Sequence, residues 1–400
     1  MFENIIGQAS VVDRLKEEIS AGTLPSSLLL YGTEYSGKMS AALEIARALT
    51  CERGTAEWNC SCRGCEAQRM LAHQDTVFLG PRYFTTEIAA CADVLLRVRK
   101  TPAQYLLVRA VRKLLHRFDP LLWEGTESKR GAVQTQIDEV EERLGDLLPG
   151  SPLPNEKVLA KTLGVINERC VKIAGAVTDN IPINQIRKVI FWAHTTGQSP
   201  AKVLIVESAE RMLDSSRNAL LRILEEPPRG VYLILTTTRR GAIIPTIQSR
   251  LRPYHFAARS SEESRQVLSK IFREENPEYH DLRDYFLAWN DTDIEFLKRE
   301  TGRFLNGILD SGGSSKPDDE LLSFLSNPRV FRPFLEELST ACGRILSGKE
   351  EAGRSLPIER LEGFSEAIRS TLMQSEQYNQ SASLLLESLY YAMRKTGRPA

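Results

Sequence analysis

A short apolar run, a glycine loop and a helix-forming segment follow one another near the N-terminus of the chain. The run SSLLLYG (26–32) predicts a buried strand, and SAALEIARALT (40–50) has the helix formers and apolar spacing of a helix. Between them, Gly32 and Gly37-Lys38 stand at the spacing of a phosphate-binding loop. Strand, loop and helix in this order are the context that such a loop requires, so the segment favours an α/β domain.

Three further apolar runs predict strands of the same domain. They are DTVFLG (75–80), KVLIVE (202–207) and VYLILTTT (231–238). The second of these is nearly continuous in apolar residues, as in a parallel sheet that is covered on both faces. Helical segments separate the runs, and this alternation predicts a doubly wound parallel α/β sheet. After about residue 255 the strands stop and the pattern becomes helical.

The segment between the second and third predicted strands is too long for a compact crossover. Helical patterns at 101–125 and 135–150 predict a mostly helical insertion at roughly 85–178. The expected organisation is an α/β domain at 1–255, a small helical domain at 256–312, a polar linker at 310–320 and a second helical domain at 320–400.

Four of the seven cysteines crowd into one short segment after the first predicted helix. They are Cys51, Cys60, Cys62 and Cys65. In a reducing compartment such a cluster points to metal rather than to disulfides. Four thiolates suit a tetrahedral zinc ion and leave no open position for a water, so we expect a structural zinc module at about 51–65. One residue between Cys60 and Cys62 makes a tight step, which predicts a distorted turn or one badly placed ligand.

The balance of charges gives no sign of a nucleic-acid or membrane partner. Lys and Arg together number 52, as do Asp and Glu. No apolar run approaches the roughly 18 residues that span a bilayer, and the N-terminus lacks the pattern of a secretory signal, so we expect a cytoplasmic protein. Arg109, Arg112, Lys113 and Arg117 form a basic stripe in the insertion, which we expect to be solvated, with DNA or a partner as the alternative contact.

Five motifs occur in order along the chain. They are IIGQ near the N-terminus, the loop at 32–38, the cysteine cluster, NALLRILEEPP (218–228) and IQSR (247–250). Together they resemble the bacterial clamp-loader subunits of DNA polymerase III, over 1–84 and 179–255. The resemblance implies an AAA+ P-loop-type fold with a zinc module, followed by a helical lid and a helical collar through which subunits assemble.

The resemblance also marks the positions that an ATP-hydrolysing member uses. In such a member the third strand ends in Asp-Glu, which serve the magnesium ion and the attacking water, whereas here Glu207 and Ser208 stand there. Met39 replaces the hydroxyl residue that binds magnesium after the loop lysine. Lys38 alone can still attract phosphate, which leaves weak nucleotide binding open. We therefore interpret the loop as degenerate.

The IQSR motif keeps Ser249-Arg250, where clamp loaders place an arginine that reaches the γ-phosphate in a neighbouring subunit. A chain without hydrolytic groups of its own but with this arginine resembles the delta-prime type. The implied function is a non-hydrolysing clamp-loader subunit that helps load the sliding clamp onto primed DNA. Its implied partners are the gamma/tau motor subunits, delta, the clamp and, through the complex, DNA.

Two other functions remain as alternatives at this point. The first is a gamma/tau-type ATPase with altered motifs, against which Met39, Glu207 and Ser208 argue. The second is a zinc-dependent nucleic-acid-binding regulator, which predicts a strongly basic surface beside the cysteines. The segment CERGTAEWNCSCRGCEAQRM is mixed in charge, and such a regulator leaves NALLRILEEPP unexplained.

Overall fold

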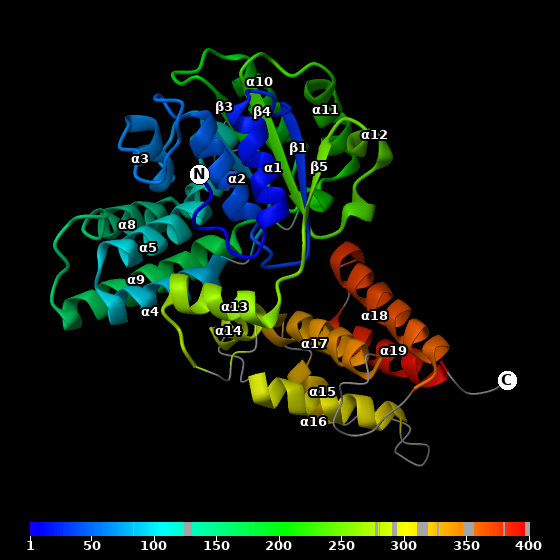
Figure 1. Cartoon of the computed structure of the whole chain (residues 1–400). Coiled ribbons are helices and arrows are strands. Elements are labelled where there is room, and N and C mark those ends of the chain that lie inside the picture. The colour runs from blue at the N-terminus through cyan, green and yellow to red at the C-terminus, as the bar shows by residue number, and fades with distance from the viewer. Residues whose placement is uncertain are drawn as a thin grey trace. The chain divides into compact units, whose positions relative to one another are not determined.

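The computed structural model of the chain divides into two compact units, Met1–Phe286 and Leu287–Ala400. It describes residues 1–82, 84–123, 130–178, 180–276, 279, 281–289, 294–309, 319–325, 328–346, 356–378 and 381–396. The first unit contains a sheet and many helices, and the described part of the second is helical. Figure 1 shows the elements in chain order by colour.

A five-stranded parallel sheet forms the centre of the first unit (Figure 1). Its strands are β1 (Ser27–Gly32), β2 (Thr76–Leu79), β3 (Lys202–Val206), β4 (Val231–Thr237) and β5 (Arg252–Phe256), in the spatial order β2-β3-β4-β1-β5. β1 lies between β4 and β5, and in its register Leu29 pairs with Leu235 of β4 and Pro253 of β5. Because all the strands run parallel, the loops that follow them meet at one edge of the sheet. The predicted parallel α/β sheet is confirmed.

The sheet has one strand more than the four that the sequence indicated. β5 reads RPYHF, and its residues alternate between exposed and buried rather than forming an apolar run. Pro253 has no N–H for a neighbouring strand, which is tolerated because β5 lies at the edge of the sheet and pairs with β1. Edge exposure and the proline together explain why no continuous apolar signal marks this strand.

Helices that flank the glycine loop pack on one face of the sheet. α1 (Ala9–Ser20) and α2 (Lys38–Leu49) share a buried core with Leu28, Leu30, Val203 and Ile205. α3 (Arg63–Arg69) follows the cysteines and contacts α2. Elsewhere in this unit, α10 (Ile183–His194) packs on α11 (Asp214–Glu225), which contacts α12 (Pro245–Gln248). α13 (Ser261–Val267) and the π-helix η4 (Leu268–Phe272) follow, and α14 (Leu282–Ala288) contains the unit boundary at Phe286.

The predicted insertion at 85–178 corresponds to a group of helices between β2 and β3 (Figure 1). Its described elements are α4 (Phe84–Val98), α5 (Thr101–Leu115), the 3₁₀ helix η1 (His116–Phe118), α6 (Pro120–Trp123), α8 (Gln134–Gly145) and α9 (Glu156–Gly175). α4 packs on α5 and α9, and α8 packs on α9. The insertion therefore has a helical core of its own beside the sheet.

The second unit is a helical bundle around aromatic side chains. Its helices are α15 (Ile294–Leu309), α16 (Asp319–Leu325), α17 (Pro328–Leu346), α18 (Ile358–Tyr378) and α19 (Ala382–Lys395). The ring centroid of Phe304 lies 5.0 Å from that of Phe334 and 5.4 Å from that of Tyr390. The unit boundary after Phe286 falls inside the predicted lid at 256–312, and most of the predicted linker lies outside the described residues. Lid and collar therefore stay predictions.

Candidate functional site

The glycine loop between β1 and α2 is closed on its own lysine. At Gly32, φ is 149° and an added Cβ would lie 2.0 Å from the carbonyl oxygen of Phe256, so only glycine fits. The Lys38 ammonium donates to the carbonyl oxygens of Gly32, at 2.9 Å, and Thr33, and to Ser36 Oγ at 3.2 Å. Burial lowers the pKa of Lys38 to about 8. The group that would bind phosphate thus lies among the loop's own oxygen atoms.

Arg259, in the segment after β5, holds the outer side of this loop. Its Nε donates to the carbonyl oxygen of Ile6 at 3.2 Å, and its Nη1 donates to that of Tyr35. A Cβ added at Gly37, where φ is 98°, would lie 2.9 Å from Arg259 Nη2. The Tyr35 ring stacks on Phe286 with centroids 5.3 Å apart. Protein groups therefore fix the loop from outside, and sequence reasoning identified neither Arg259 nor Tyr35.

Met39, at the position of the magnesium-binding hydroxyl, belongs to the hydrophobic core. Its side chain is buried and packs with the apolar residues of α1, α2 and the sheet. Magnesium prefers hard oxygen ligands, and a buried thioether offers none. The first turn of α2 therefore has no metal ligand at this position.

Glu207 follows β3 directly, and both of its carboxylate oxygens are engaged. Oε1 accepts a hydrogen bond from Arg82 Nη1 at 2.7 Å, and Oε2 accepts one from Arg117 Nη2 at 2.8 Å. Arg82 lies in the loop between β2 and α4, and Arg117 lies in η1. The backbone of Ser208 adopts the left-handed conformation, with φ of 52°. Its hydroxyl donates to the carbonyl oxygen of Pro81 at 3.3 Å. Each oxygen of this carboxylate is therefore bound by a guanidinium group.

Two more charges complete this buried network. Arg82 Nη2 lies 2.6 Å from Glu87 Oε2, and Lys113 Nζ lies 2.5 Å from Glu87 Oε1. Burial acts to raise the pKa of Glu87, but Arg82 and Lys113 hold it at about 2. Burial also lowers the pKa of Arg117 to about 10, although Glu207 opposes this. These five side chains join α4, α5 and η1 of the insertion to the end of β3.

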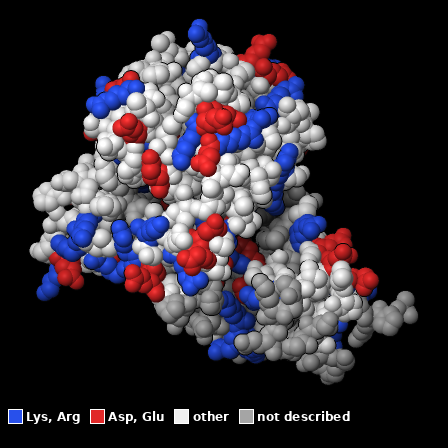
Figure 2. Space-filling view, viewed as in Figure 1, with Lys and Arg blue, Asp and Glu red and all other residues white. Residues whose placement is uncertain are grey.

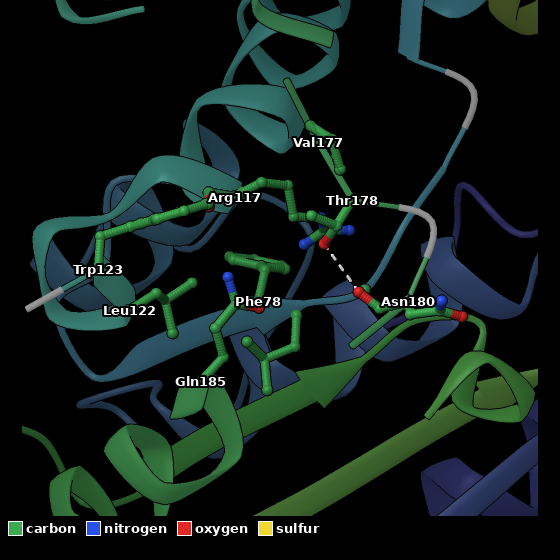
Figure 3. A pocket seen from close by; sticks show the side chains of 10 residues that line it. Phe78, Arg117, Leu122, Trp123, Val177, Thr178, Asn180 and Gln185 are labelled. Carbon is green, nitrogen blue, oxygen red and sulfur yellow. Dashed lines mark hydrogen bonds between the residues drawn. The ribbon is translucent and has the colours of Figure 1, made fainter. Parts of the chain in front are cut away.

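A small pocket lies beside Arg117 (Figure 3). Phe78 and Trp123 line it, together with Thr178, whose hydroxyl donates to the carbonyl oxygen of Asn180 at 2.8 Å. Among the described residues, Nε and Nη1 of Arg117 have no hydrogen-bond partner. The pocket has room for about one water molecule, so it can satisfy one of these donors but cannot admit a nucleotide.

The predicted metal ligands converge between α2 and α3. The Sγ atoms of Cys51, Cys60, Cys62 and Cys65 all lie within 4.8 Å of one another, and all four residues are buried. Cys51 Sγ is 3.8 Å from Cys60 Sγ and 3.9 Å from Cys62 Sγ. Sulfur atoms about 2.3 Å from a zinc ion at the centre of a regular tetrahedron would be about 3.8 Å apart. The cluster can hold a metal, and the two distances from Cys51 Sγ match those of a tetrahedral zinc site.

Arg47 of α2 places a fixed positive charge beside this cluster. Its Nη1 lies 3.4 Å from Cys65 Sγ, and it forms a buried ion pair with Glu44. The Cys62 sulfur accepts a hydrogen bond from the backbone N–H of Cys65 at 3.4 Å. Burial opposes ionisation of Cys62, but hydrogen bonds from the backbone of Cys65 and Glu52 lower its pKa to about 6. The contacts of Cys62 therefore favour its thiolate, which is the form that binds metal, whereas burial and the neighbouring sulfur atoms raise the pKa of Cys65 despite Arg47.

The basic stripe on α5 is partly or fully buried, so the prediction of a solvated face was wrong. The contacts are Arg109 Nη1 to Arg69 O at 3.1 Å, Arg112 Nη1 to Met70 O at 2.7 Å and His116 Nε2 to Leu71 O at 2.7 Å. These carbonyls belong to the last residue of α3 and the two residues after it, where a helix presents unpaired oxygen atoms and the negative end of its dipole. Lys113 and Arg117 reach the buried carboxylates instead. The stripe thus fixes the cysteine module to the insertion.

Arg250 lies two residues after α12, apart from the loop and the cysteines. Its Nη1 donates to the carbonyl oxygen of Thr246 at 2.8 Å, and its Nη2 lies 2.7 Å from Glu225 Oε1. Its side chain is 35% exposed, so it can reach another molecule.

The structure brings the predicted site residues Gly32, Gly37 and Lys38 into one loop and the four cysteines into one cluster. It leaves Arg250 on a separate surface. Arg82 and Glu87 at the loop edge were not identified from the sequence.

The charged surface is mixed on the face that Figure 2 shows. Lys and Arg side chains alternate there with Asp and Glu, without a continuous basic area. Within the described helices, none is long and apolar enough to cross a membrane. This face offers no argument for a nucleic-acid-binding surface.

Comparisons with known proteins agree on one family. The family model for "DNA polymerase III, delta subunit" matches residues 7–116 and 160–260. The DNA polymerase III subunit gamma/tau of Mycobacterium tuberculosis is 35% identical over 101 residues, 25% of this chain and 17% of that protein. The DNA polymerase III subunit delta' of Haemophilus influenzae is 30% identical over 100 residues, 25% of this chain and 31% of that protein. The delta' subunit of Pseudomonas aeruginosa is 37% identical over 71 residues, 18% of this chain and 22% of that protein.

The match to the family model covers more than half of the 400 residues and includes the glycine loop, the cysteine cluster and Arg250. The stretch from Arg117 to residue 159 lies outside it, so one arginine that holds Glu207 comes from a part of the insertion that the model does not match. The matched stretches span less than a third of the three relatives. The chain belongs to the DNA polymerase III, delta subunit, family and is a clamp-loader-related subunit.

Proposed function

We propose that this chain is a delta-prime-like subunit of the DNA polymerase III clamp loader that does not hydrolyse ATP itself. In this role it helps load the sliding clamp onto primed DNA, together with gamma/tau motor subunits and delta, and its neighbours hydrolyse the ATP. The relatives are named as subunits of DNA polymerase III, which supports a place for this chain in that complex. The observation that carries the non-hydrolysing role is the engagement of both Glu207 oxygens by Arg82 and Arg117.

The energetics of this carboxylate argue against the gamma/tau-type alternative. A metal ion at Glu207 would have to share this carboxylate with the positive charges of Arg82 and Arg117 or displace one of them, and Arg117 is 4% exposed. Breaking a buried ion pair costs about 3–5 kcal/mol because the remaining charge stays buried. With Met39 in the core and Ser208 unable to act as a base, three separate changes oppose hydrolysis.

The regulator alternative has little support in the site. A four-cysteine zinc centre has no open coordination position, so its role is to hold the fold rather than to catalyse. In the basic stripe that was the candidate DNA contact, Arg109 and Arg112 bind the carbonyl oxygens of Arg69 and Met70. We therefore assign zinc a structural role.

The proposal gives Arg250 the role of an arginine supplied in trans. Its exposed position away from its own loop supports this role. A guanidinium that reaches a neighbour's γ-phosphate stabilises the charge that develops during phosphoryl transfer, and its fixed charge suits it for this. The helices at 320–400 supply the collar through which the subunits assemble.

Affinity purification of the native protein tests the assignment to the complex. We expect the gamma/tau motor and delta subunits to be recovered with it. Mass spectrometry of the eluted proteins is the measurement, and a culture that carries only the affinity tag is the control. Recovery of a separate set of proteins without any polymerase III subunit would contradict the proposal.

The isolated chain is expected to show no ATPase activity above background. Lys38→Ala should leave this background unchanged, because the lysine already bonds to its own loop and the buried Met39 follows it where a hydroxyl residue would bind magnesium. Phosphate release is measured with and without magnesium. Turnover on the order of 1 s⁻¹, which is the low end of typical enzyme rates, together with its loss in Lys38→Ala would make the chain an ATPase.

A further inference from the structure

Glu225 is the ion-pair partner of Arg250, and the resemblance in the NALLRILEEPP motif assigns it no function. We propose that Glu225 is a positioning residue that holds the Arg250 guanidinium in a resting position and releases it when a neighbour's nucleotide takes its place. This inference rests on the proposed role of Arg250 in trans. It adds a residue and a regulation to that role, because the carboxylate sets how readily the arginine becomes available.

The local fold fixes both ends of this contact. Glu225 is the last residue of α11, and Pro227-Pro228 follow after one residue. Proline cannot continue a helix and disfavours helical backbone in the residue before it, and Glu226 is indeed outside the helical region, at φ −133° and ψ 73°. The two prolines therefore set the end of α11 at Glu225. This gives the NALLRILEEPP motif a physical reason to end as it does.

The other end is set by the short helix α12. Arg250 Nη1 donates to the carbonyl oxygen of Thr246 in that helix at 2.8 Å, while Nη2 lies 2.7 Å from Glu225 Oε1. α11 and α12 pack against each other, so the carboxylate and the arginine face each other across two fixed elements. One guanidinium is thus held from two sides in a defined position.

The exposure of the pair makes this a releasable contact. The side chain of Glu225 is 50% exposed and that of Arg250 35% exposed. Exposed ion pairs contribute roughly 0.2–1 kcal/mol, far less than buried ones. A γ-phosphate carries more negative charge than a carboxylate and can accept from the same N–H groups, so it displaces Glu225 at a small cost. That cost corresponds to roughly a 1.4- to 5-fold weaker apparent affinity for the neighbour's nucleotide.

The experiment uses a reconstituted clamp-loader complex in which only the motor site beside this subunit can hydrolyse ATP. We expect Glu225→Gln to lower the half-saturating ATP concentration roughly 1.4- to 5-fold and to leave kcat unchanged, because the competing charge is gone and Arg250 is intact. The shift should shrink as salt rises, since salt screens an exposed pair. Glu226→Gln removes the same charge from the adjacent exposed residue and should cause no shift.

Arg250→Ala separates failure of this inference from failure of the proposed function. We expect it to lower kcat at the adjoining site by roughly 10³-fold. If Arg250→Ala hydrolyses ATP like wild type, the proposed role of Arg250 is wrong. If Arg250→Ala is impaired but Glu225→Gln behaves like Glu226→Gln, only the holding role of Glu225 is wrong. A parallel fall of kcat in Glu225→Gln would also overturn release, because Glu225 would then be needed in the active position.

Discussion

A Cys65→Ser variant is expected to lose tightly bound zinc and, with it, the folded cysteine module. Cys65 is fully buried, lies within 4.8 Å of the other three sulfur atoms and has the Arg47 guanidinium beside it. Structural zinc contributes apparent binding energies of about 10–16 kcal/mol in small modules, so losing one of four ligands has a large effect. Elemental analysis of protein purified without chelator should fall from about one zinc per chain to near zero.

The loss should extend into the insertion, because α5 binds the end of α3. Arg109 and Arg112 donate to carbonyl oxygens of α3 and the residue after it, and these acceptors lose their fixed position when the module unfolds. Hydrogen exchange should therefore become faster in α3 and also in α5. Cys91→Ser is the matched control, because Cys91 is buried in α4 outside the cluster. This variant protein should keep its zinc. Zinc retained by Cys65→Ser, or absent from the wild type, would count against the site.

The elements that the sequence predicted are those with a local signal. Apolar runs marked β1 to β4, glycine spacing marked the loop, and short cysteine spacing marked a cluster whose sulfur atoms do lie together. In each case the residues that act together are close in sequence, or share a pattern that burial imposes directly. β5 has neither property, because an edge strand with a proline needs no apolar run.

The two arginines that bind Glu207 had no such signal in the sequence. Arg82 is 125 positions from Glu207, and Arg117 is 90 positions from it. A buried arginine and an exposed one look the same in a sequence, and only the fold decides which carboxylate comes within reach. The stripe on α5 was misread for the same reason: its spacing indicated one helix face, but the acceptors are backbone oxygens, which every sequence contains. The sequence could therefore point to Met39, Glu207 and Ser208, but not to the side chains that bind Glu207.

Glu207→Gln is expected to destabilise the first unit by about 3–5 kcal/mol, because Arg82 and Arg117 then share a buried site without the carboxylate between them. A loss of this size lowers the melting temperature by roughly 6–20 °C for a domain of this length. Thermal and denaturant unfolding at pH 7 are the measurements. The remaining carboxylate, Glu87, has its pKa held at about 2, so its contribution is complete above the ordinary value of 4.5 and is lost only as the pH falls toward 2.

The double variant Arg117→Met/Glu207→Gln shows whether the loss comes from this ion pair. It removes both partners, leaves a side chain that packs without a charge, and should be more stable than the sum of the two single changes predicts, by roughly 1–3 kcal/mol. A chain that used Glu207 as a metal ligand would behave differently. In such a chain without metal, Glu207→Gln would remove the cost of burying an unpaired carboxylate, so stability would stay equal or rise. ATP hydrolysis would disappear. If Arg82 and Arg117 bind Glu207 in place of a metal ion, Glu207→Gln should lower stability, and neither the wild type nor the variant should hydrolyse ATP.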